Sequence, residues 1–477
     1  MKRLKMFLFA MGVVLSYQGS GQTLDKLFAG NDSLNSFSLD NFYQIILKNH
    51  PVVSQAELLN EIARQELRYA RGNFDPKLVA NADHKQFDDK VYYTKVDAGL
   101  SLPTWFPVNP KVGYQNHSGA LLNAEEGIPG EEQIYAGVSI PIGKGLITDE
   151  RRIAVRQAEQ MKSIAEADRV KIINKILLDA AKDYWHWFFS FHQFKLIEQN
   201  VTLSKQILER TRLSARQGEA SGIDTIQASI NLQSRLVELQ EASVTRLNAE
   251  LQLSNYLWSD DKEPVLLQPS RPVMTRLDSA DIDNTTLDSL VSAAAANHPE
   301  LASIAAKINQ AELEKSLARE MLKPQLDLNY YALSQPTASR TFDLRNDYKW
   351  GVDFSIPVFL RKERSKLALA DAKITSARLQ KLQSQREIAN RIRMQFNQYQ
   401  NSKKIITQQR SIADLYEKLV SAELTNLENG ESDLFKINVQ QEKLIQAQVK
   451  LLKSHSELQK EKASLFWAAG NMATSKP

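Results

Sequence analysis

The chain has 477 residues, of which 43% are apolar and none is cysteine. This length allows two or three ordinary domains, and the apolar content favours a folded protein over a disordered one. The lack of cysteine excludes disulfides, thiolate metal sites and a cysteine nucleophile. The formal net charge of +4 falls to +1 if Lys2, Arg3 and Lys5 are removed, which excludes the strongly basic surface typical of nucleic-acid-binding proteins.

The first residues have the order of a secretory signal peptide. Cations precede an apolar run over residues 6–15, and small residues follow up to Gly21. We therefore expect a signal peptide over residues 1–21, with cleavage near Gln22. An uncleaved membrane anchor is the alternative, but about ten apolar residues are too few to cross a bilayer, which takes roughly twenty. No later segment of the sequence is apolar for long enough to predict a transmembrane helix.

The rest of the sequence is an internal repeat. Asn-His-Pro occurs at residues 49–51 and again at 297–299, and each copy is followed 25 positions later by a proline, Pro76 or Pro324. Three further pairs recur in the same order: Ser139-Ile140-Pro141 with Ser355-Ile356-Pro357, Gly218-Glu219 with Gly430-Glu431, and Leu257-Trp258 with Phe466-Trp467. The predicted organisation is a first repeat over 22–258, a linker over 259–285, a second repeat over 286–469 and a tail over 470–477.

Each repeat opens with helical periodicity, near 39–72 and near 286–322, which a proline ends. Alternating apolar and polar residues then predict two-faced strands within 77–142 and 325–358. The longer first segment predicts an extra hairpin around Trp105 to Tyr114. In the first repeat the predicted apolar side is Tyr92, Thr94, Val96, Ala98, Leu100 and Leu102, and the polar side is Lys95, Asp97, Gly99 and Ser101.

Helical periodicity returns after each Ser-Ile-Pro and predicts a long helical hairpin in each repeat, over 149–258 and 362–468. The first helix of each hairpin has no proline and, at about 1.5 Å per residue, is on the order of 100 Å long. No compact domain needs such a helix. The returning helices carry apolar residues seven positions apart, which predicts coiled-coil packing: Ile230, Val237, Val244, Leu251 and Trp258, and Ile437, Leu444, Leu451, Leu458 and Leu465.

Two-faced strands alone favour an ordinary soluble sheet, but the other features of the sequence favour a membrane. Tyr92, Tyr348 and Trp350 lie on the predicted apolar faces and fit the aromatic girdles of membrane strands. A membrane sheet must close so that no strand edge meets lipid, and each repeat offers only about two to four strands. We therefore expect several chains to share one barrel.

The doubled Asn-His-Pro, Ser-Ile-Pro and Gly-Glu motifs resemble those of the TolC family of outer-membrane efflux proteins. The resemblance covers essentially all of the sequence that follows the predicted signal peptide. The resemblance implies an α+β membrane protein, a homotrimer whose β-barrel lies in the outer-membrane lipid and joins a coiled-coil α-helical barrel in the periplasm. It also implies a passive exit duct of a tripartite efflux or secretion system, docked on a periplasmic adaptor (membrane fusion) protein and an inner-membrane transporter. Neither a cofactor nor a nucleic-acid partner is implied. The alternatives are a periplasmic coiled-coil scaffold without a conduit, and an exported enzyme or carbohydrate-binding protein with helical repeats.

The turns between the long and the returning helices are the candidate gate. Asp224 and Asp433 lie 34 positions before the paired tryptophans Trp258 and Trp467, and threefold assembly would turn each aspartate into a ring that attracts cations. Simple helix capping is the alternative. The gate candidates are Arg216, Gly218, Glu219 and Asp224 in the first repeat, and Glu428, Gly430, Glu431 and Asp433 in the second.

No catalytic or metal site is predicted. His186 and His192 are six positions apart on a predicted helix and so lie on different faces. The histidines of the two Asn-His-Pro motifs are interpreted as residues at helix starts. An aromatic stretch in the first long helix is either a hydrophobic binding site or helix packing, and packing is favoured because its members point around most of the helix: Tyr184, Trp185, Trp187, Phe188, Phe189, Phe191 and Phe194.

Overall fold

The computed structural model describes residues 35–218, 221–273, 282–336, 342–429, 431–432 and 434–472. The predicted signal peptide therefore lies outside the described residues, as does most of the predicted tail. The described chain divides into two units. Unit 1 contains residues up to Ala56 together with 170–298 and 386–477, and unit 2 contains 57–169 and 299–385. Three helices, α4, α5 and α9, contribute residues to both units.

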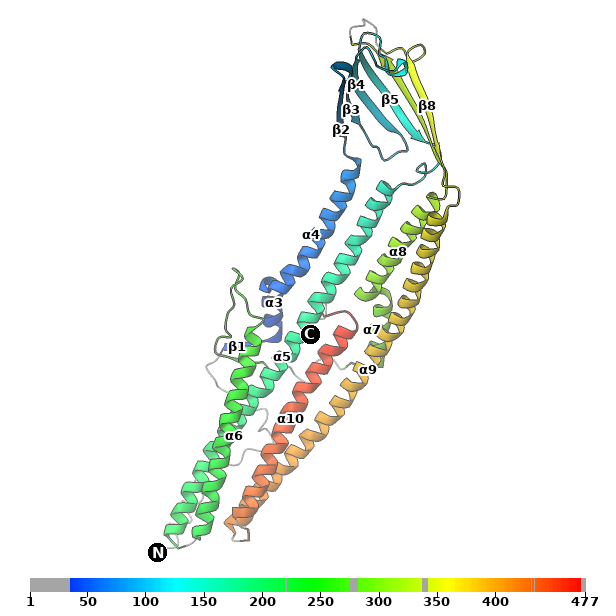
Figure 1. Ribbon diagram of the computed structural model, residues 1–477. Helices are drawn as coiled ribbons and strands as arrows, with labels where there is room; N and C mark the ends of the chain where they lie inside the picture. The colour runs from blue at the N-terminus through cyan, green and yellow to red at the C-terminus, as the bar shows by residue number, and fades with distance from the viewer. Residues whose placement is uncertain are drawn as a thin grey trace. The chain divides into compact units, whose positions relative to one another are not determined.

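Figure 1 labels the elements, which combine long helices with one large antiparallel sheet. In chain order they are β1 (Asn35–Phe37), α3 (Leu39–Asn49), α4 (Pro51–Arg71), β2 (Lys77–Phe87), β3 (Lys90–Ser101), β4 (Asn109–Ser118), β5 (Glu132–Pro141), α5 (Glu150–Arg216), α6 (Gly222–Ser254), β6 (Ser270–Pro272), α7 (Asn284–Asn297), α8 (Pro299–Glu320), β7 (Gln325–Ser334), β8 (Tyr348–Ser355), α9 (Arg361–Glu428) and α10 (Leu434–Ala468). Helices α5 and α9 contain 67 and 68 residues and are the long helices that the sequence predicted.

Both Asn-His-Pro motifs split a predicted helix in two. His50 ends α3 with an extended backbone (φ −68°, ψ 130°), and His298 ends α7 in the same conformation (φ −63°, ψ 129°). The single helices predicted near 39–72 and 286–322 were therefore wrong, because a following proline disfavours the helical conformation of the residue before it. The prolines begin α4 and α8, the position where their missing N–H costs nothing.

Unit 2 contains a six-stranded antiparallel sheet with the order β2-β3-β4-β5-β7-β8. The first repeat supplies four strands and the second supplies two, so the sheet joins the repeats through the pairing of β5 with β7. The predicted extra hairpin is present, but residues 102–108 form the turn between β3 and β4, and Trp105 lies in that turn rather than in a strand. Among the described residues, no strand pairs with the outer edge of β2 or of β8.

The strand registers give this sheet one apolar and one polar face. Leu100 on β3 lies opposite Leu78 and Val112, and this row continues through Ala136 and Ala332 to Tyr348. The other face carries polar rows such as Asp83, Lys95 and His117, and Asn81, Asp97, Gln115 and Gln133. The predicted alternation in the first repeat is confirmed, except that Leu102 lies beyond the end of β3.

Unit 1 has its core around the aromatic stretch of α5. Tyr184, Trp185, Trp187 and Phe188 are all buried and pack edge-on against one another, and Tyr184 packs in a tilted arrangement against Phe42 of α3. The Tyr184 hydroxyl donates to the Phe37 carbonyl oxygen at 2.8 Å. The packing interpretation of the aromatic stretch is therefore confirmed for these buried members.

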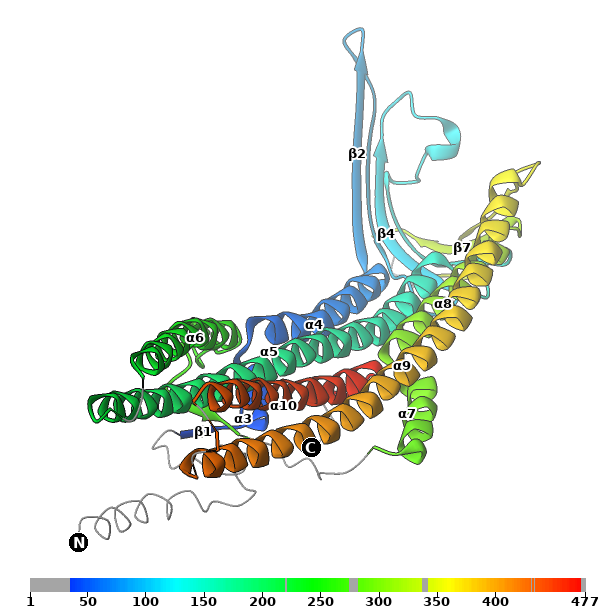
Figure 2. The ribbon, with the colours of Figure 1, turned by 90° about the horizontal axis from the view of Figure 1, so that it is seen from below.

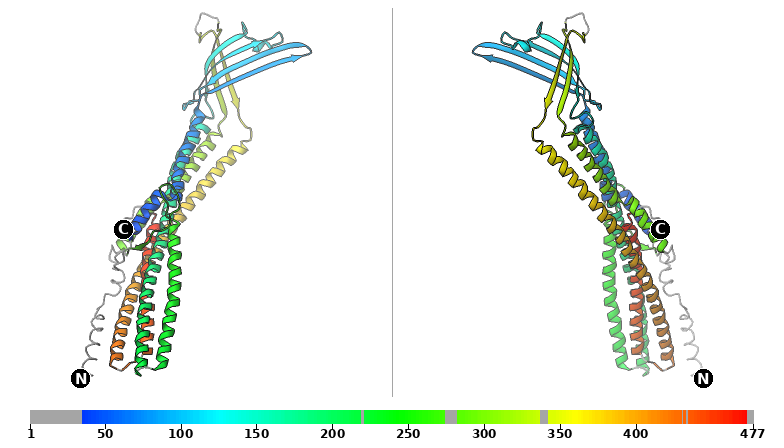
Figure 3. Two further views of the ribbon diagram at one scale, coloured as in Figure 1. Left: turned by 90° about the vertical axis from the view of Figure 1, so that its left-hand side faces the viewer. Right: turned by 90° about the vertical axis from the view of Figure 1, so that its right-hand side faces the viewer.

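In Figures 2 and 3, α5 and α10 lie between α6 and α9 within unit 1. Side chains link these helices: Ser456 of α10 donates to the Trp185 carbonyl at 2.6 Å, and Asn231 of α6 donates to Asn438 of α10 at 2.9 Å. The predicted linker is not wholly irregular, because its β6 pairs in parallel with β1. No pattern in the sequence predicts this short pairing.

Candidate functional site

The tip of the first hairpin holds four of the gate candidates. Arg216 is the last residue of α5 and is exposed, and Gly218 turns the chain with φ at +77°, a conformation that glycine adopts readily. Asp224 forms a capping box with Ser221: its carboxylate accepts from the Ser221 N–H at 2.9 Å, while its own N–H donates to the Ser221 hydroxyl at 3.2 Å. Capping therefore engages one oxygen of the carboxylate, and Glu219 lies outside the described residues.

The tip of the second hairpin is described only in part. Glu428 ends α9, and Glu431 is exposed, with its backbone N–H donating to the Asn426 carbonyl at 2.8 Å. Gly430, Asp433 and the side chain of Glu428 lie outside the described residues. The proposed match between Asp224 and Asp433 thus stays a prediction.

A charged cluster on the polar face of the sheet was missed by the sequence analysis. Lys95 of β3 forms an ion pair with Glu126, which belongs to the loop between β4 and β5. His117 of β4 has Nε2 at 3.1 Å from the Asp97 carboxylate and Nδ1 at 3.1 Å from the Glu126 carbonyl oxygen. Gln115 also donates to Asp97, at 2.8 Å. These contacts hold the β4–β5 loop against the polar face.

The same face carries two tyrosine rings that lie over glycines. A Cβ placed on Gly113 would come within 2.5 Å of the Tyr135 ring, and one on Gly137 would come within 2.5 Å of the Tyr331 ring. The two rings pack edge-on with centroids 5.7 Å apart. Any larger residue at either glycine would have to displace an aromatic ring, so the glycines fix how the polar face is shaped.

The three predicted interface aromatics lie on the apolar face of the sheet but not in one row of cross-strand neighbours. Trp350 and Tyr348 of β8 are exposed, and Tyr348 stacks on Tyr330 with ring centroids 5.8 Å apart. Tyr92 is half-buried and lies near the start of β3, eight positions before Leu100. Leu100 is the β3 residue in the cross-strand row that contains Tyr348. The structure therefore does not bring the three together.

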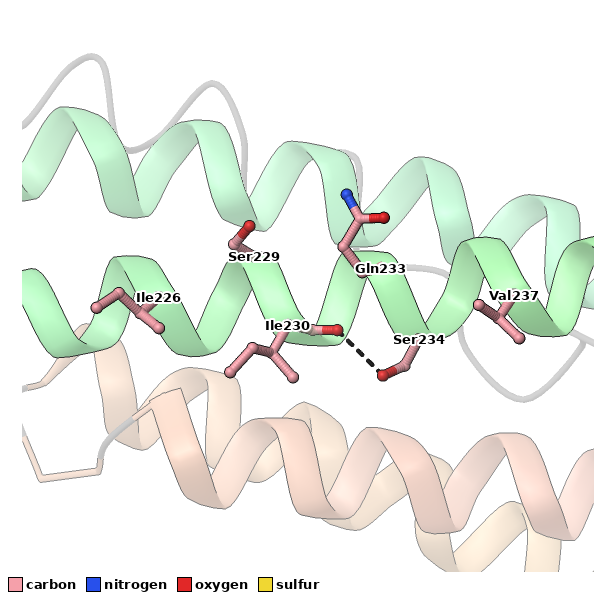
Figure 4. A pocket seen from close by; sticks show the side chains of 6 residues that line it. All are labelled: Ile226, Ser229, Ile230, Gln233, Ser234 and Val237. Atoms are coloured by element: carbon pink, nitrogen blue, oxygen red, sulfur yellow. Dashed lines mark hydrogen bonds between the residues drawn. The ribbon is translucent and has the colours of Figure 1, made fainter.

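The surface of α6 presents an exposed apolar stripe. Figure 4 shows six side chains that line a shallow groove on this helix, and among them Ile230, Val237 and Ser234 are labelled with the hydrogen bond from the Ser234 hydroxyl to the Ile230 carbonyl, 3.0 Å long. The stripe continues along α6 through Val244 and Leu251, both more than half exposed. The four predicted heptad residues that lie on α6 are thus mainly exposed in the described chain, whereas the fifth, Trp258, follows the helix and packs against His50.

Within the described ranges there is no group of three or more histidine, aspartate or glutamate side chains placed to bind a metal ion. His186 and His192 do not come together: His192 is buried against Phe188, whereas His186 is only partly buried. None of the described helices has a stretch long and apolar enough to span a bilayer.

Comparison with known proteins agrees with this architecture. Residues 290–471 match the family model for the outer membrane efflux protein. A search of curated protein sequences finds no significant relative.

Solved structures of outer membrane proteins share the fold over nearly the whole chain, at low sequence identity. The outer membrane channel CmeC of Campylobacter jejuni is 14% identical, with 92% of this chain and 87% of CmeC covered and a TM-score of 0.64. The outer membrane protein VceC of Vibrio cholerae is 16% identical, with 91% and 96% covered and a TM-score of 0.63. The open state of MtrE of Neisseria gonorrhoeae is 14% identical, with 91% and 89% covered and a TM-score of 0.66. The predicted resemblance is thereby confirmed: residues 290–471 match the family model for the outer membrane efflux protein, and nearly the whole chain has the fold of these solved structures.

Proposed function

We propose that this chain is one subunit of a homotrimeric outer-membrane exit duct, through which cargo delivered by a periplasm-spanning pump or secretion transporter leaves the cell passively. The observation that carries the proposal concerns the outermost elements of each unit. In both units, the two outermost elements differ from each other, and each has a side that is exposed in the described chain. Such edges are satisfied when the edge of one copy meets the opposite edge of the next around a closed ring.

The sheet supplies the first pair of edges, β2 and β8. Six strands with one apolar face cannot close around a water-filled space, because even eight strands leave an interior that side chains fill. Three copies bring three times six, or eighteen, strands, a number at which barrels enclose an aqueous channel. The apolar face would then meet lipid and the polar face, with its loop cluster, would line the lumen.

The helices of unit 1 supply the second pair, α6 and α9. Each has an exposed apolar residue every seventh position: Ile230, Val237 and Val244 on α6, and Ile405, Ile412 and Leu419 on α9. The stripes match in height above the hairpin tips. Val237 lies 15 residues after the start of α6, and Ile412 lies 16 residues before the end of α9. The other two pairs, Ile230 with Leu419 and Val244 with Ile405, are offset by one residue in the same way.

The hairpin tips would face the periplasmic adaptor and the inner-membrane transporter, and would form the gate. Asp224 accepts only the Ser221 N–H among the described hydrogen bonds, through one carboxylate oxygen, so its other oxygen can face a threefold axis. A ring of three such carboxylates would concentrate cations at the entrance. The polar face and the lack of a catalytic cluster in the described chain fit a conduit whose energy comes from its partners.

The absence of cysteine makes cross-linking a direct test. The variant Val237→Cys with Ile412→Cys should form disulfide-linked dimers and trimers on oxidation in membranes, because the two residues would lie at the same height in neighbouring copies. The matched control, Val237→Cys with Lys450→Cys, places its second cysteine on an exposed site of α10 and should stay monomeric on a denaturing gel.

Conductance in planar bilayers provides the second measurement. The purified protein should be a detergent-stable trimer that opens ion-conducting pores. A water-soluble monomer that conducts no current and does not cross-link would overturn the proposal and favour a periplasmic scaffold.

A further inference from the structure

The connection from β8 to α9 carries two exposed apolar side chains followed by three cations. Val358 and Phe359 are 86% and 71% exposed. Arg361, Lys362 and Arg364 follow in the first turn of α9 and are all exposed. We call these five residues the β8–α9 collar. Large apolar groups held out beside cations are typical of surfaces that contact a membrane interface.

The backbone holds the collar in an unusual conformation. Leu360 has φ at +49°, a left-handed conformation that leucine rarely adopts, whereas the corresponding connection of the first repeat has glycine with positive φ, Gly145 at +97°. Backbone strain of this kind persists only where the surrounding structure fixes the path of the chain. Beyond this bend, the Arg361 guanidinium lies over the Phe359 ring, 5.1 Å from its centroid, which keeps a cation beside the exposed apolar group.

The three cations of the collar share the first turn of α9 with one carboxylate, Glu363, but form no ion pair within the described chain. Among the described residues, no ion pair or hydrogen bond involves the side chains of Arg361, Lys362 or Arg364. Cations in the first turn of a helix are also unfavourable, because the helix dipole is positive there. Neither the helix nor the rest of the chain therefore accounts for three cations at this position.

The first repeat uses its arginines differently at the same point. Arg151 donates to Asp149 at 3.0 Å, and the buried Arg152 donates to the carbonyl oxygens of Gly145 and Ile147 at 2.6 and 2.9 Å. Those arginines stabilise a turn. The second repeat has no such network, so its cations are available to an external anion.

The position of the collar identifies the anion. A row of exposed apolar residues on β8, continued by Ile356 just after the strand, leads directly to it: Tyr348, Trp350, Val352, Phe354 and Ile356. If this row meets lipid, as the proposed function requires, the end of the row nearest α9 lies at the boundary between the hydrocarbon core and the lipid headgroups. We propose that the β8–α9 collar binds the phosphate headgroup of an anionic phospholipid in the periplasmic leaflet, with Val358 and Phe359 inserted beside its acyl chains. Guanidinium and ammonium groups are the donors that proteins use for phosphate.

The test measures which lipid the full-length protein retains. Purified trimers are mixed with equal amounts of phosphatidylglycerol and phosphatidylethanolamine, and bound lipid is counted by native mass spectrometry. We expect about a tenfold preference for phosphatidylglycerol, weakened by salt, since each cation near an anionic headgroup contributes severalfold to binding. The variant Arg361→Gln, Lys362→Gln, Arg364→Gln should lose this preference.

The matched control removes the same charge elsewhere. Lys443→Gln, Lys450→Gln, Lys453→Gln changes three exposed lysines of α10 that form no ion pair in the described chain, and it should keep the preference. Equal retention by the collar variant and the control would overturn the inference. So would loss of the trimer in the collar variant alone, because the cations would then bind a neighbouring copy. If wild-type protein forms no trimer and no pore, the proposed function fails; if it forms pores without a lipid preference, only this inference fails.

Discussion

The two returning helices have the same heptad pattern and opposite surroundings. On α6 the stripe is exposed, with Val237 and Val244 at 55% and 57%, whereas on α10 Leu451 and Leu458 are each 5% exposed. Helix α10 lies between α5 and α9, so its stripe has neighbours within the chain, while α6 lies at one side of the unit (Figure 2). A repeat that was duplicated in sequence has therefore become a core element in one copy and an outer surface in the other. In the proposed trimer, that outer surface is what the next subunit contacts.

A charged residue placed on either stripe should have the largest effect, on folding for α10 and on assembly for α6. Leu451→Asp buries an unpaired carboxylate and should cost more than about 4 kcal/mol, enough to abolish cooperative thermal unfolding followed by circular dichroism. Val237→Asp with Val244→Asp should leave the helical signal intact but abolish the trimer, measured by light scattering in detergent. A trimer that survives the α6 variant would contradict the role assigned to this stripe.

The buried side of the comparison should also be sensitive to acid. Burial, and then the neighbouring His455, lower the pKa of His192 from 6.5 to about 3. Between these values the unfolded chain takes up a proton that the folded chain does not, so stability falls as the pH drops below 6.5 and is unaffected above it. From pH 6.5 to pH 5 the loss from this residue is about 2 kcal/mol.

Urea unfolding at pH 7 and pH 5 checks this prediction. His192→Gln should reduce the loss between the two pH values by about 2 kcal/mol, because the glutamine does not titrate. His298, whose pKa burial lowers to about 4, should keep its own contribution in that variant. An unchanged pH dependence would show that His192 is not the group responsible.

The start of α6 should give a smaller effect than its stripe. Asp224→Ala removes one side of the capping box and should cost about 1 kcal/mol locally, seen as faster hydrogen exchange in the first turn of α6. The same variant should also raise single-channel conductance or weaken cation block if Asp224 lines the gate. Asp224→Asn keeps a capping side chain and separates the two roles, since it should restore the turn but not the cation effect.

The smallest effect on stability concerns the polar face of the sheet. Lys95→Met breaks the ion pair with Glu126 and should cost less than about 1 kcal/mol. It should nevertheless free the β4–β5 loop and change the ion selectivity of the proposed pore, measured as a reversal potential in a salt gradient. Exchanging the charges, Lys95→Glu with Glu126→Lys, should restore the wild-type value. No change in either variant would show that the loop does not border the conducting path.

Local patterns predicted much of this molecule. The 67-residue α5 and the two-faced β3 follow from periodicities of 3.6 and 2, which depend only on residues near one another in sequence. The prolines Pro51 and Pro299 marked helix starts correctly, but the same local reading missed that the preceding histidines end other helices. Of the candidate gate, sequence found the turn glycine Gly218 and the capping aspartate, since both act through their own neighbours.

Other missed features depend on contacts between distant segments. Glu126 meets Lys95 across 31 residues, and β1 pairs with β6 across more than 200, so neither could be read from spacing.

The repeat, the element types and the apolar stripes could all be predicted from the sequence, because each follows from side-chain order along one helix or strand. The three-dimensional packing was needed to show which stripe is buried, which strand edges are unpaired and which cations form an ion pair with a carboxylate. These outcomes depend on what a segment packs against, and two copies of one pattern met different neighbours.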